Sequence, residues 1–222
     1  MPGRAPARSV PQLLFVFCLA LWAGHAEIVD RIAVSVGNRV ITAADLDREI
    51  RITALLNGEK PDFGPANKRQ TAERMVDQRL VRSELEASRY MLPSAAEGDA
   101  ALKELKSRYP DEAAYRRGLA EYGLDEDDLK TRLLWQLTLM RFLDIRFRPG
   151  IQVGDEEIRS YFNEHLRPGL QQANPGKSFS LDDYRDTVEQ TLIGQAVNQQ
   201  VEQWLVTARK RTRIEYHEEV FR

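Results

Sequence analysis

The sequence predicts a mostly α-helical fold with a small antiparallel sheet formed by an N-terminal hairpin and a C-terminal strand. Apolar and polar residues alternate near the two ends of the chain, at 30–41 and 212–221, as in half-buried strands. Between these segments, apolar residues recur every three or four positions, which is typical of amphipathic helices. Because an isolated hairpin is only marginally stable in water, we expect the last strand to join the first hairpin in one sheet.

The composition is that of an ordinary globular protein. The chain has 222 residues, of which 42% are hydrophobic and 30% charged, and this excludes a collagen-like, low-complexity or wholly disordered protein. The 32 basic and 34 acidic residues give a net charge of −2, which argues against a general nucleic-acid-binding protein. A single cysteine cannot form an internal disulfide or anchor a cysteine-rich zinc site.

The first 26 residues have the pattern of a secretory signal peptide. Arg4 and Arg8 precede an apolar run, Leu13–Trp22, and small residues end the segment at Gly24 and Ala26. The run is shorter than the ~20 residues that a transmembrane helix needs, and bulky residues before Cys18 argue against a lipoprotein. We expect cleavage to leave a soluble, exported, cysteine-free chain of 196 residues without stable membrane insertion.

The hairpin and the first two helices have clear boundary signals. Gly37-Asn38 tolerates positive φ and predicts a tight turn. Thr42 is expected to cap a helix that carries Asp45 in its first turn and stops near residue 58. A loop with two prolines follows, and a longer helix is predicted from about Pro65 to Tyr90.

Three more helices are predicted before residue 150, over about 93–109, 111–123 and 125–148. The third has acidic residues at 125–128 and arginines near its other end, which complements the helix dipole. Its expected apolar stripe is formed by Leu129, Leu133, Leu137 and Met140.

The C-terminal part is predicted as a short charged helix from Asp155 to near His165, a polar linker over 167–180 and a long helix. Ser180 would cap the long helix, with Asp183 at the capping-box position. The closing strand then covers 212–221.

Few residues offer catalytic chemistry. His165 and His217 have no companion at the spacing of a metal site or catalytic triad, and no phosphate-binding loop or nucleophile elbow is present. The acidic run 125–128 is better explained as a helix N-terminus than as a metal site. We therefore expect two exposed histidines, no enzyme activity, no metal and no cofactor.

Five aromatic side chains between residues 109 and 147 are candidates for lining a groove that binds an extended peptide. Packing in the core is the alternative role for each of them. The candidate peptide-binding residues are Tyr109, Tyr115, Tyr122, Trp135 and Phe147.

Four segments, in order and spacing, resemble the SurA-type periplasmic chaperones and their secreted foldase relatives. The segment VDRIAVSVGNRVITAADLD (29–47) is similar to the opening of the mature family members. The others are AERMVDQRLVRSELEA (72–87), LAEYGLDEDDLKTRL (119–133) and VGDEEIRSYF (153–162). The resemblance covers about 28–165 and the closing helix and strand. Together with the predicted signal peptide, it implies a SurA-like chaperone core that is located in the periplasm.

The main departure from the family is a missing catalytic insert. Family members commonly carry parvulin-type prolyl isomerase domains before the closing helix, whereas here a short linker, 166–180, separates a chaperone region (27–165) from the completing segment (181–222). The resemblance therefore implies an ATP-independent holdase for unfolded exported proteins, without isomerase activity. The alternatives are a dedicated assembly partner of one protein and a residual prolyl isomerase; a monomer and a dimer both remain open.

Overall fold

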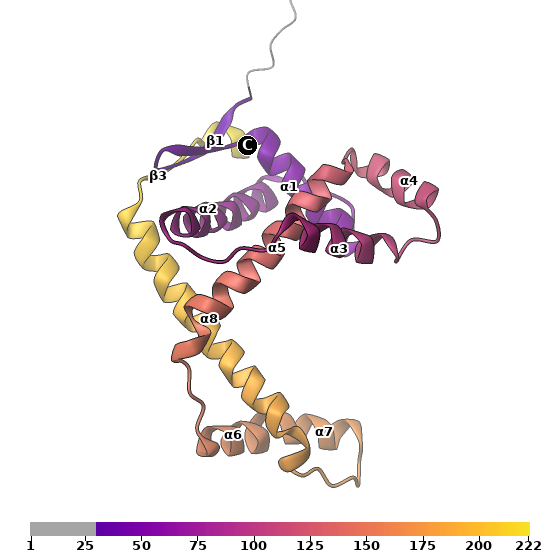
Figure 1. The fold of residues 1–222 in the computed structure, drawn as a ribbon, viewed down its shortest axis with the longest axis vertical. Coiled ribbons are helices and arrows are strands. Elements are labelled where there is room, and N and C mark those ends of the chain that lie inside the picture. Colours follow the sequence, from indigo (N-terminus) through magenta and orange to yellow (C-terminus); the bar gives the residue numbers. More distant parts are fainter. Residues whose placement is uncertain (1–29) are drawn as a thin grey trace, which may run out of the picture.

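The computed structural model describes residues 30–222. Within this range the chain is mostly helical with one three-stranded antiparallel sheet, which confirms the predicted fold class at that level. Figure 1 shows a body that holds the sheet and the first five helices, and a distal lobe, residues 153–192, at the other end of the molecule. The predicted signal peptide, 1–26, lies outside the described residues. None of the described helices is long and apolar enough to cross a membrane.

The sheet joins the two ends of the described chain. β1 (Ile32–Val36) and β2 (Arg39–Thr42) form the predicted hairpin, and Gly37 adopts a positive φ of 59° in its turn. β3 (Ile214–Tyr216) pairs antiparallel with the other edge of β1, so the strand order is β2-β1-β3. The expectation that the last strand completes the hairpin sheet is therefore confirmed.

The last residues of the chain close the first apolar cluster. The strand predicted to run to residue 221 ends at Tyr216, and a 3₁₀ turn over Glu218–Phe221 follows. This turn buries Val220 and Phe221 against the sheet, α1 (Ala43–Asn57) and α2 (Pro65–Ala87). The buried residues of the cluster are Ala33, Val34, Val36, Ile41, Leu46, Ala72, Val76, Leu80, Val220 and Phe221.

The first two helices begin where the sequence predicts. The backbone N–H of Asp45 donates to the Thr42 hydroxyl and the N–H of Thr42 donates to the Asp45 carboxylate, both at 3.1 Å, which makes a capping box. Gly58 ends α1 with a φ of 70°. Pro65 occupies the first turn of α2, where its missing N–H costs nothing. The helix ends at Ala87, slightly before the predicted end.

The next three helices are α3 (Ala95–Lys106), α4 (Glu112–Tyr122) and α5 (Glu126–Arg146). Ser94, Asp111 and Asp125 cap their N-termini through side-chain oxygens that accept backbone N–H groups. Together with α1, these helices enclose a second apolar cluster. Its buried residues are Ile52, Leu102, Tyr115, Leu119, Leu124 and Leu129.

The distal lobe has an apolar cluster of its own. α6 (Asp155–Tyr161), a π-helical turn (Phe162–Leu166) and α7 (Arg167–Ala173) pack with the first turns of α8 (Arg185–Arg211). The buried residues of this cluster are Ile158, Phe162, Phe179 and Val188.

Two sequence predictions for this lobe are wrong. Residues 167–173 of the expected polar linker form α7, because the π-helical turn continues the chain in helical form and Leu170 packs on the lobe's cluster. Ser180 accepts a hydrogen bond from the N–H of Asp182 at 3.3 Å, but a 3₁₀ turn follows, and α8 begins at Arg185 without a side-chain cap. The expected capping box with Asp183 is therefore not formed.

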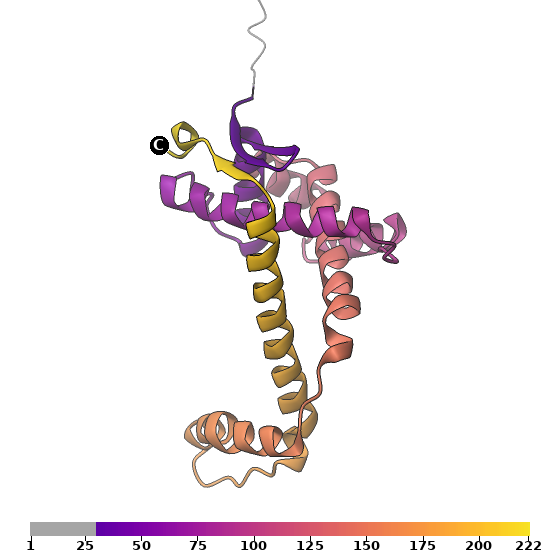
Figure 2. The ribbon, with the colours of Figure 1, turned by 90° about the vertical axis from the view of Figure 1, so that its left-hand side faces the viewer.

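The long helix α8 connects the distal lobe to the body (Figure 2). Near its C-terminal end, Arg209 donates to the carboxylates of Asp77 at 2.7 Å and Glu73 at 2.8 Å, both on α2. Farther from that end, Trp204 packs edge-on against Phe142 of α5, with ring centroids 5.9 Å apart. α5 and α8 are thus joined by an aromatic contact and α8 is fastened to α2 by ion pairs.

The apolar face of α5 differs from the predicted stripe. Leu129 is buried as expected, but Met140 is 60% exposed, and Trp135, Thr138 and Phe142 are buried instead. The reason is that α5 changes neighbours along its length: its first half packs against α1, α3 and α4, and its second half against α2 and α8. A single straight stripe cannot face both sets of helices.

Because Phe221 closes a cluster built from both ends of the chain, we expect Phe221→Ala to lower the free energy of unfolding by about 3 kcal/mol, as large-to-small core substitutions do. Urea unfolding followed by circular dichroism measures this change. Val206→Ala on the exposed side of α8 is the control, with an expected change within about 0.5 kcal/mol. Equal changes in the two variants would show that the C-terminal turn does not contribute to the core.

Candidate functional site

A hollow of about 390 Å³ lies between α1, α2 and the N-terminal part of α5, and we call it the charged hollow. Five carboxylates and four arginines border this hollow. Its charged residues are Asp45, Arg48, Glu49, Arg79, Arg82, Asp125, Asp127, Asp128 and Arg132.

Three of the four arginines are paired with carboxylates across the hollow. Arg48 lies 3.3 Å from Asp128, Arg79 lies 3.8 Å from Asp45, and Arg132 lies 3.6 Å from Glu49. These pairs connect α1 to α5 and α2 to α1. The first two pairs are partly exposed and contribute little stability each, whereas the side chains of Arg132 and Glu49 are only 24% and 12% exposed. Together the three pairs neutralise most of the positive charge of the hollow.

Glu49 is the most buried of these carboxylates. Burial raises the pKa of Glu49 above its ordinary value, and the opposing effects of Arg132, Arg74 and Arg82 do not overcome it. Glu49 is not among the site residues predicted from the sequence, although it stands three positions after the buried Leu46 on the same helix face. A charged residue at that spacing is the signal that could have identified it.

The fourth arginine, Arg82, has no carboxylate within ion-pair distance among residues 30–222. Its guanidinium instead lies over the ring of Trp135, 3.9 Å from the centroid, a cation–π contact. Burial and the nearby Arg79 and Arg39 lower the pKa of Arg82 below its ordinary value, and the opposing effects of Glu86 and Glu49 do not overcome them. A cation in these surroundings is poorly compensated by the protein itself.

A second hollow of about 240 Å³, the apolar hollow, lies beside the first and shares Arg82, Thr131 and Trp135 with it. It separates the C-terminal end of α2 from α5. Its remaining lining residues are Leu85, Glu86, Leu92, Leu134 and Thr138. The two hollows thus meet at the stacked pair of Arg82 and Trp135.

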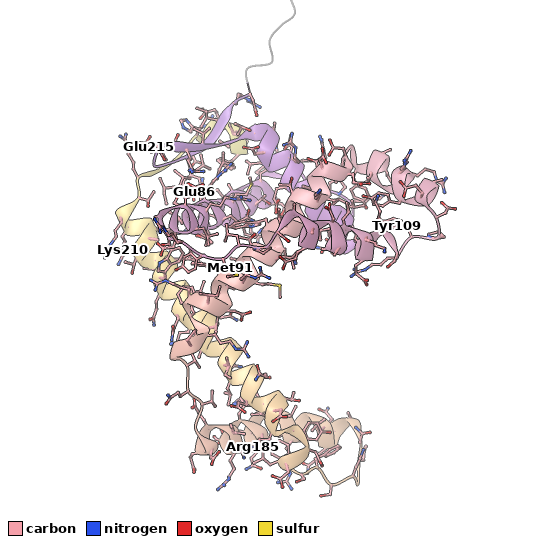
Figure 3. The ribbon with its side chains drawn as sticks, in the orientation of Figure 1. Glu86, Met91, Tyr109, Arg185, Lys210 and Glu215 are labelled. Carbon is pink, nitrogen blue, oxygen red and sulfur yellow. The ribbon has the colours of Figure 1, made fainter. Side chains whose placement is uncertain are left out.

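Exposed apolar side chains stand next to the apolar hollow. Met91 is 80% exposed and Leu92 is 48% exposed, in the loop between α2 and α3. Figure 3 shows Met91 on the underside of the body, the side nearer the distal lobe. An ion pair of 2.6 Å between Glu97 and Arg141 holds the start of α3, and with it this loop, along α5.

The five candidate peptide-binding aromatics do not line one groove. Tyr109, Tyr115 and Tyr122 belong to the second cluster in the body, whereas Trp135 and Phe147 belong to a third cluster between α2, α5 and α8. Tyr115, Trp135 and Phe147 are buried against neighbouring helices. Of the five, Trp135 borders the two hollows. A role of the other four in peptide contact remains a prediction, with core packing as the role that their positions favour.

The donors around the hollows include two that are left without a partner within residues 30–222. These are the indole N–H of Trp135 and the Nε–H of Arg132, both buried. Buried donors without acceptors cost free energy. Both side chains border the charged hollow.

The candidate metal ligands and the histidines are dispersed in the described part of the chain. No group of three or more histidine, cysteine, aspartate or glutamate residues there could hold a metal ion. Asp125 and Asp128 form a capping box at the start of α5, as the helix-terminus interpretation predicts. His165 is exposed and lies beside Tyr161, whereas His217 is only half-exposed, 3.4 Å from the hydroxyl of Ser35.

In comparisons with known proteins, no protein-family model matches the chain and no curated protein matches it significantly.

The raised pKa of Glu49 predicts how stability changes with pH. A carboxyl whose pKa is higher in the folded state favours folding while it is protonated, and this contribution is lost as pH rises through the raised pKa. Glu49→Gln removes that loss. We therefore expect the variant to gain stability relative to the unchanged protein as pH rises from about 4 to about 7, measured by urea unfolding.

Glu121→Gln, at an exposed position of α4, is the matched control for Glu49→Gln and is expected to follow the unchanged protein. If Glu49→Gln becomes relatively less stable with rising pH, the ion pair with Arg132 outweighs the cost of burial, and our account of the charged hollow is wrong.

Proposed function

We propose that the protein is an ATP-independent periplasmic holdase of the SurA type, which keeps unfolded exported proteins or outer-membrane protein precursors from aggregating. The observation that carries the proposal is the exposed apolar surface where the loop after α2 runs along α5. Met91 and Leu92 contribute side chains that are 80% and 48% exposed, and Leu92 lines the apolar hollow. Apolar side chains gathered beside a hollow are typical of surfaces that bind other chains.

The residue types on this surface suit a binder of many sequences. Methionine is unbranched and polarizable, and it adapts to partners of different shape; Met91 is the most exposed large apolar side chain of the described residues. Without a nucleotide cycle to release the client, binding must remain reversible. A modest apolar area that buries parts of an extended chain would meet that requirement.

The arrangement of the chain supports the family part of the proposal. The resemblance implies an N-terminal region completed by a returning C-terminal helix and strand. In the body, β3 pairs with β1, and α8 packs against α2 through Arg209. We propose that this body is a SurA-like chaperone core.

The same resemblance supports a chaperone without an isomerase. Family members carry the parvulin domain before the closing helix, and here the chain passes from α7 to the 3₁₀ turn at Asp182–Tyr184 through residues 174–181. We expect no acceleration of prolyl isomerisation in a short X-Pro peptide. Measured acceleration would contradict this part of the proposal.

The direct test is suppression of aggregation. The purified protein is mixed at near-equimolar ratio with several unrelated unfolded outer-membrane β-barrels, and light scattering is followed after dilution from urea. A general holdase lowers the scattering of all of them. Suppression for one client alone would indicate a dedicated assembly partner, and no suppression for any client would contradict the proposal.

The surface itself is tested with Met91→Asp, which places a charge among the exposed apolar side chains. We expect the concentration needed for half-maximal suppression to rise about tenfold, since losing one buried apolar contact costs about 1.5 kcal/mol. Ile32→Asp, at an exposed apolar position of β1, is the control and should leave suppression unchanged. Equal effects of the two substitutions on suppression would show that the surface around Met91 is not the client-binding surface.

A further inference from the structure

We propose that the apolar hollow between α2 and α5 is a subsite for a carboxylate of the bound chain, with Arg82 as its anchor and an apolar side chain seated beside it. The inference rests on the proposed holdase function and adds a chemical preference to it. The occupant is an extended client segment in which a carboxylate stands next to an apolar residue.

The first argument is the distribution of charge. The acids nearest to Arg82 are already engaged: Glu86 pairs with Arg39, and Glu49 pairs with Arg132. Arg79, the other arginine of α2 on this side, pairs with Asp45. Within the described residues, Arg82 is therefore the arginine of the hollows that lacks an ion-pair partner, and a carboxylate from outside the chain would complement it.

The second argument is the geometry of the guanidinium. Its Cζ lies over the ring of Trp135, 3.9 Å from the centroid, a distance that suits stacking of the guanidinium face on the ring. Stacking leaves the in-plane N–H donors of an arginine available, and these donors match the two oxygens of a carboxylate. Trp135 is itself only 5% exposed. A rigid, buried ring therefore holds the anchor in place before any client arrives.

The third argument is the lining next to the anchor. Leu85, Leu92 and Leu134 supply apolar walls, and the volume of about 240 Å³ is far more than the ~10–15 Å³ that one water molecule needs. An apolar side chain entering here would displace water from around Arg82. Because ion pairs strengthen as the local dielectric falls, the two parts of the ligand would support each other.

The acidic residues of the charged hollow limit where the carboxylate can lie. Asp125 and Asp127 border that hollow at the start of α5 and would repel an anion. The carboxylate is therefore restricted to the end near Arg82. The acid that lines the hollow there, Glu86, is paired with Arg39, and most of the remaining lining is apolar.

The test measures binding of short synthetic peptides by competition against a fluorescent peptide. The probes are acetylated, amidated Gly/Ser nonapeptides with Leu-Glu-Leu or Leu-Gln-Leu at the centre. We expect the glutamate peptide to bind about tenfold more tightly, as for one charge-assisted hydrogen-bonded contact. A third probe, Leu-Gln-Leu with a free carboxylate placed directly after the last leucine, shows whether a chain terminus is accepted as the carboxylate source.

Variants of the anchor separate recognition from structure. Arg82→Gln should abolish the preference for the glutamate peptide and leave the affinity for the glutamine peptide within about twofold of its original value. Arg82→Lys should retain part of the preference, because lysine keeps the positive charge but lacks the paired N–H donors of the guanidinium. Arg116→Gln, at an exposed arginine of α4, is the control and should change nothing.

The outcomes distinguish this inference from the proposed function. If the protein suppresses aggregation but binds carboxylate-containing and carboxylate-free peptides equally, the subsite is wrong and the holdase function stands. If Arg82→Gln weakens all peptides to the same extent, Arg82 acts on the fold and the subsite is also wrong. If the protein neither suppresses aggregation nor binds any peptide, both proposals fail together.

Discussion

The structure depends on the closure of its first core by both ends of the described chain. β1 is the middle strand of the sheet, and its two edges are occupied by β2, which follows it directly, and by β3, which arrives after all the helices. Val220 and Phe221 then pack with Val34 and Leu46 in one cluster. This long-range pairing is entropically costly, and the apolar burial around it supplies the compensating free energy.

The closure also determines the shape of the rest of the molecule. Since the last strand must return to the first, everything between α5 and α8 leaves the body and comes back, and the distal lobe is the turning point of that path (Figure 1). The lobe is supported by its own cluster around Phe162 and Val188. The aromatic contact of Phe142 with Trp204 joins the outgoing helix to the returning one. The loop between α2 and α3, which carries Met91, lies on the side of the body nearer the lobe (Figure 3).

The hollows show how burial and pairing compete where three helices bring many charges together. At Glu49 the cost of burial exceeds the attraction of the nearby arginines, and the pKa rises. At Arg82 the protein supplies an aromatic face rather than a carboxylate. The same helices therefore form one largely neutralised hollow and one poorly compensated cation beside leucine side chains. That combination favours an amphipathic ligand over a purely apolar one.

The sequence by itself determined the helical class, the hairpin, the start of most helices and the joining of the last strand to the first, because turns, caps and alternation are local signals and an unpaired hairpin is unstable. It did not determine which side of α5 is buried along each half of the helix, or that residues 167–173 are helical. Both depend on neighbours that are distant in the chain. The residues of the two hollows were likewise predictable only in part. Trp135 was recognisable as an aromatic candidate, but only the tertiary structure placed Arg82 on its ring and buried Glu49, because both result from three helices packing together.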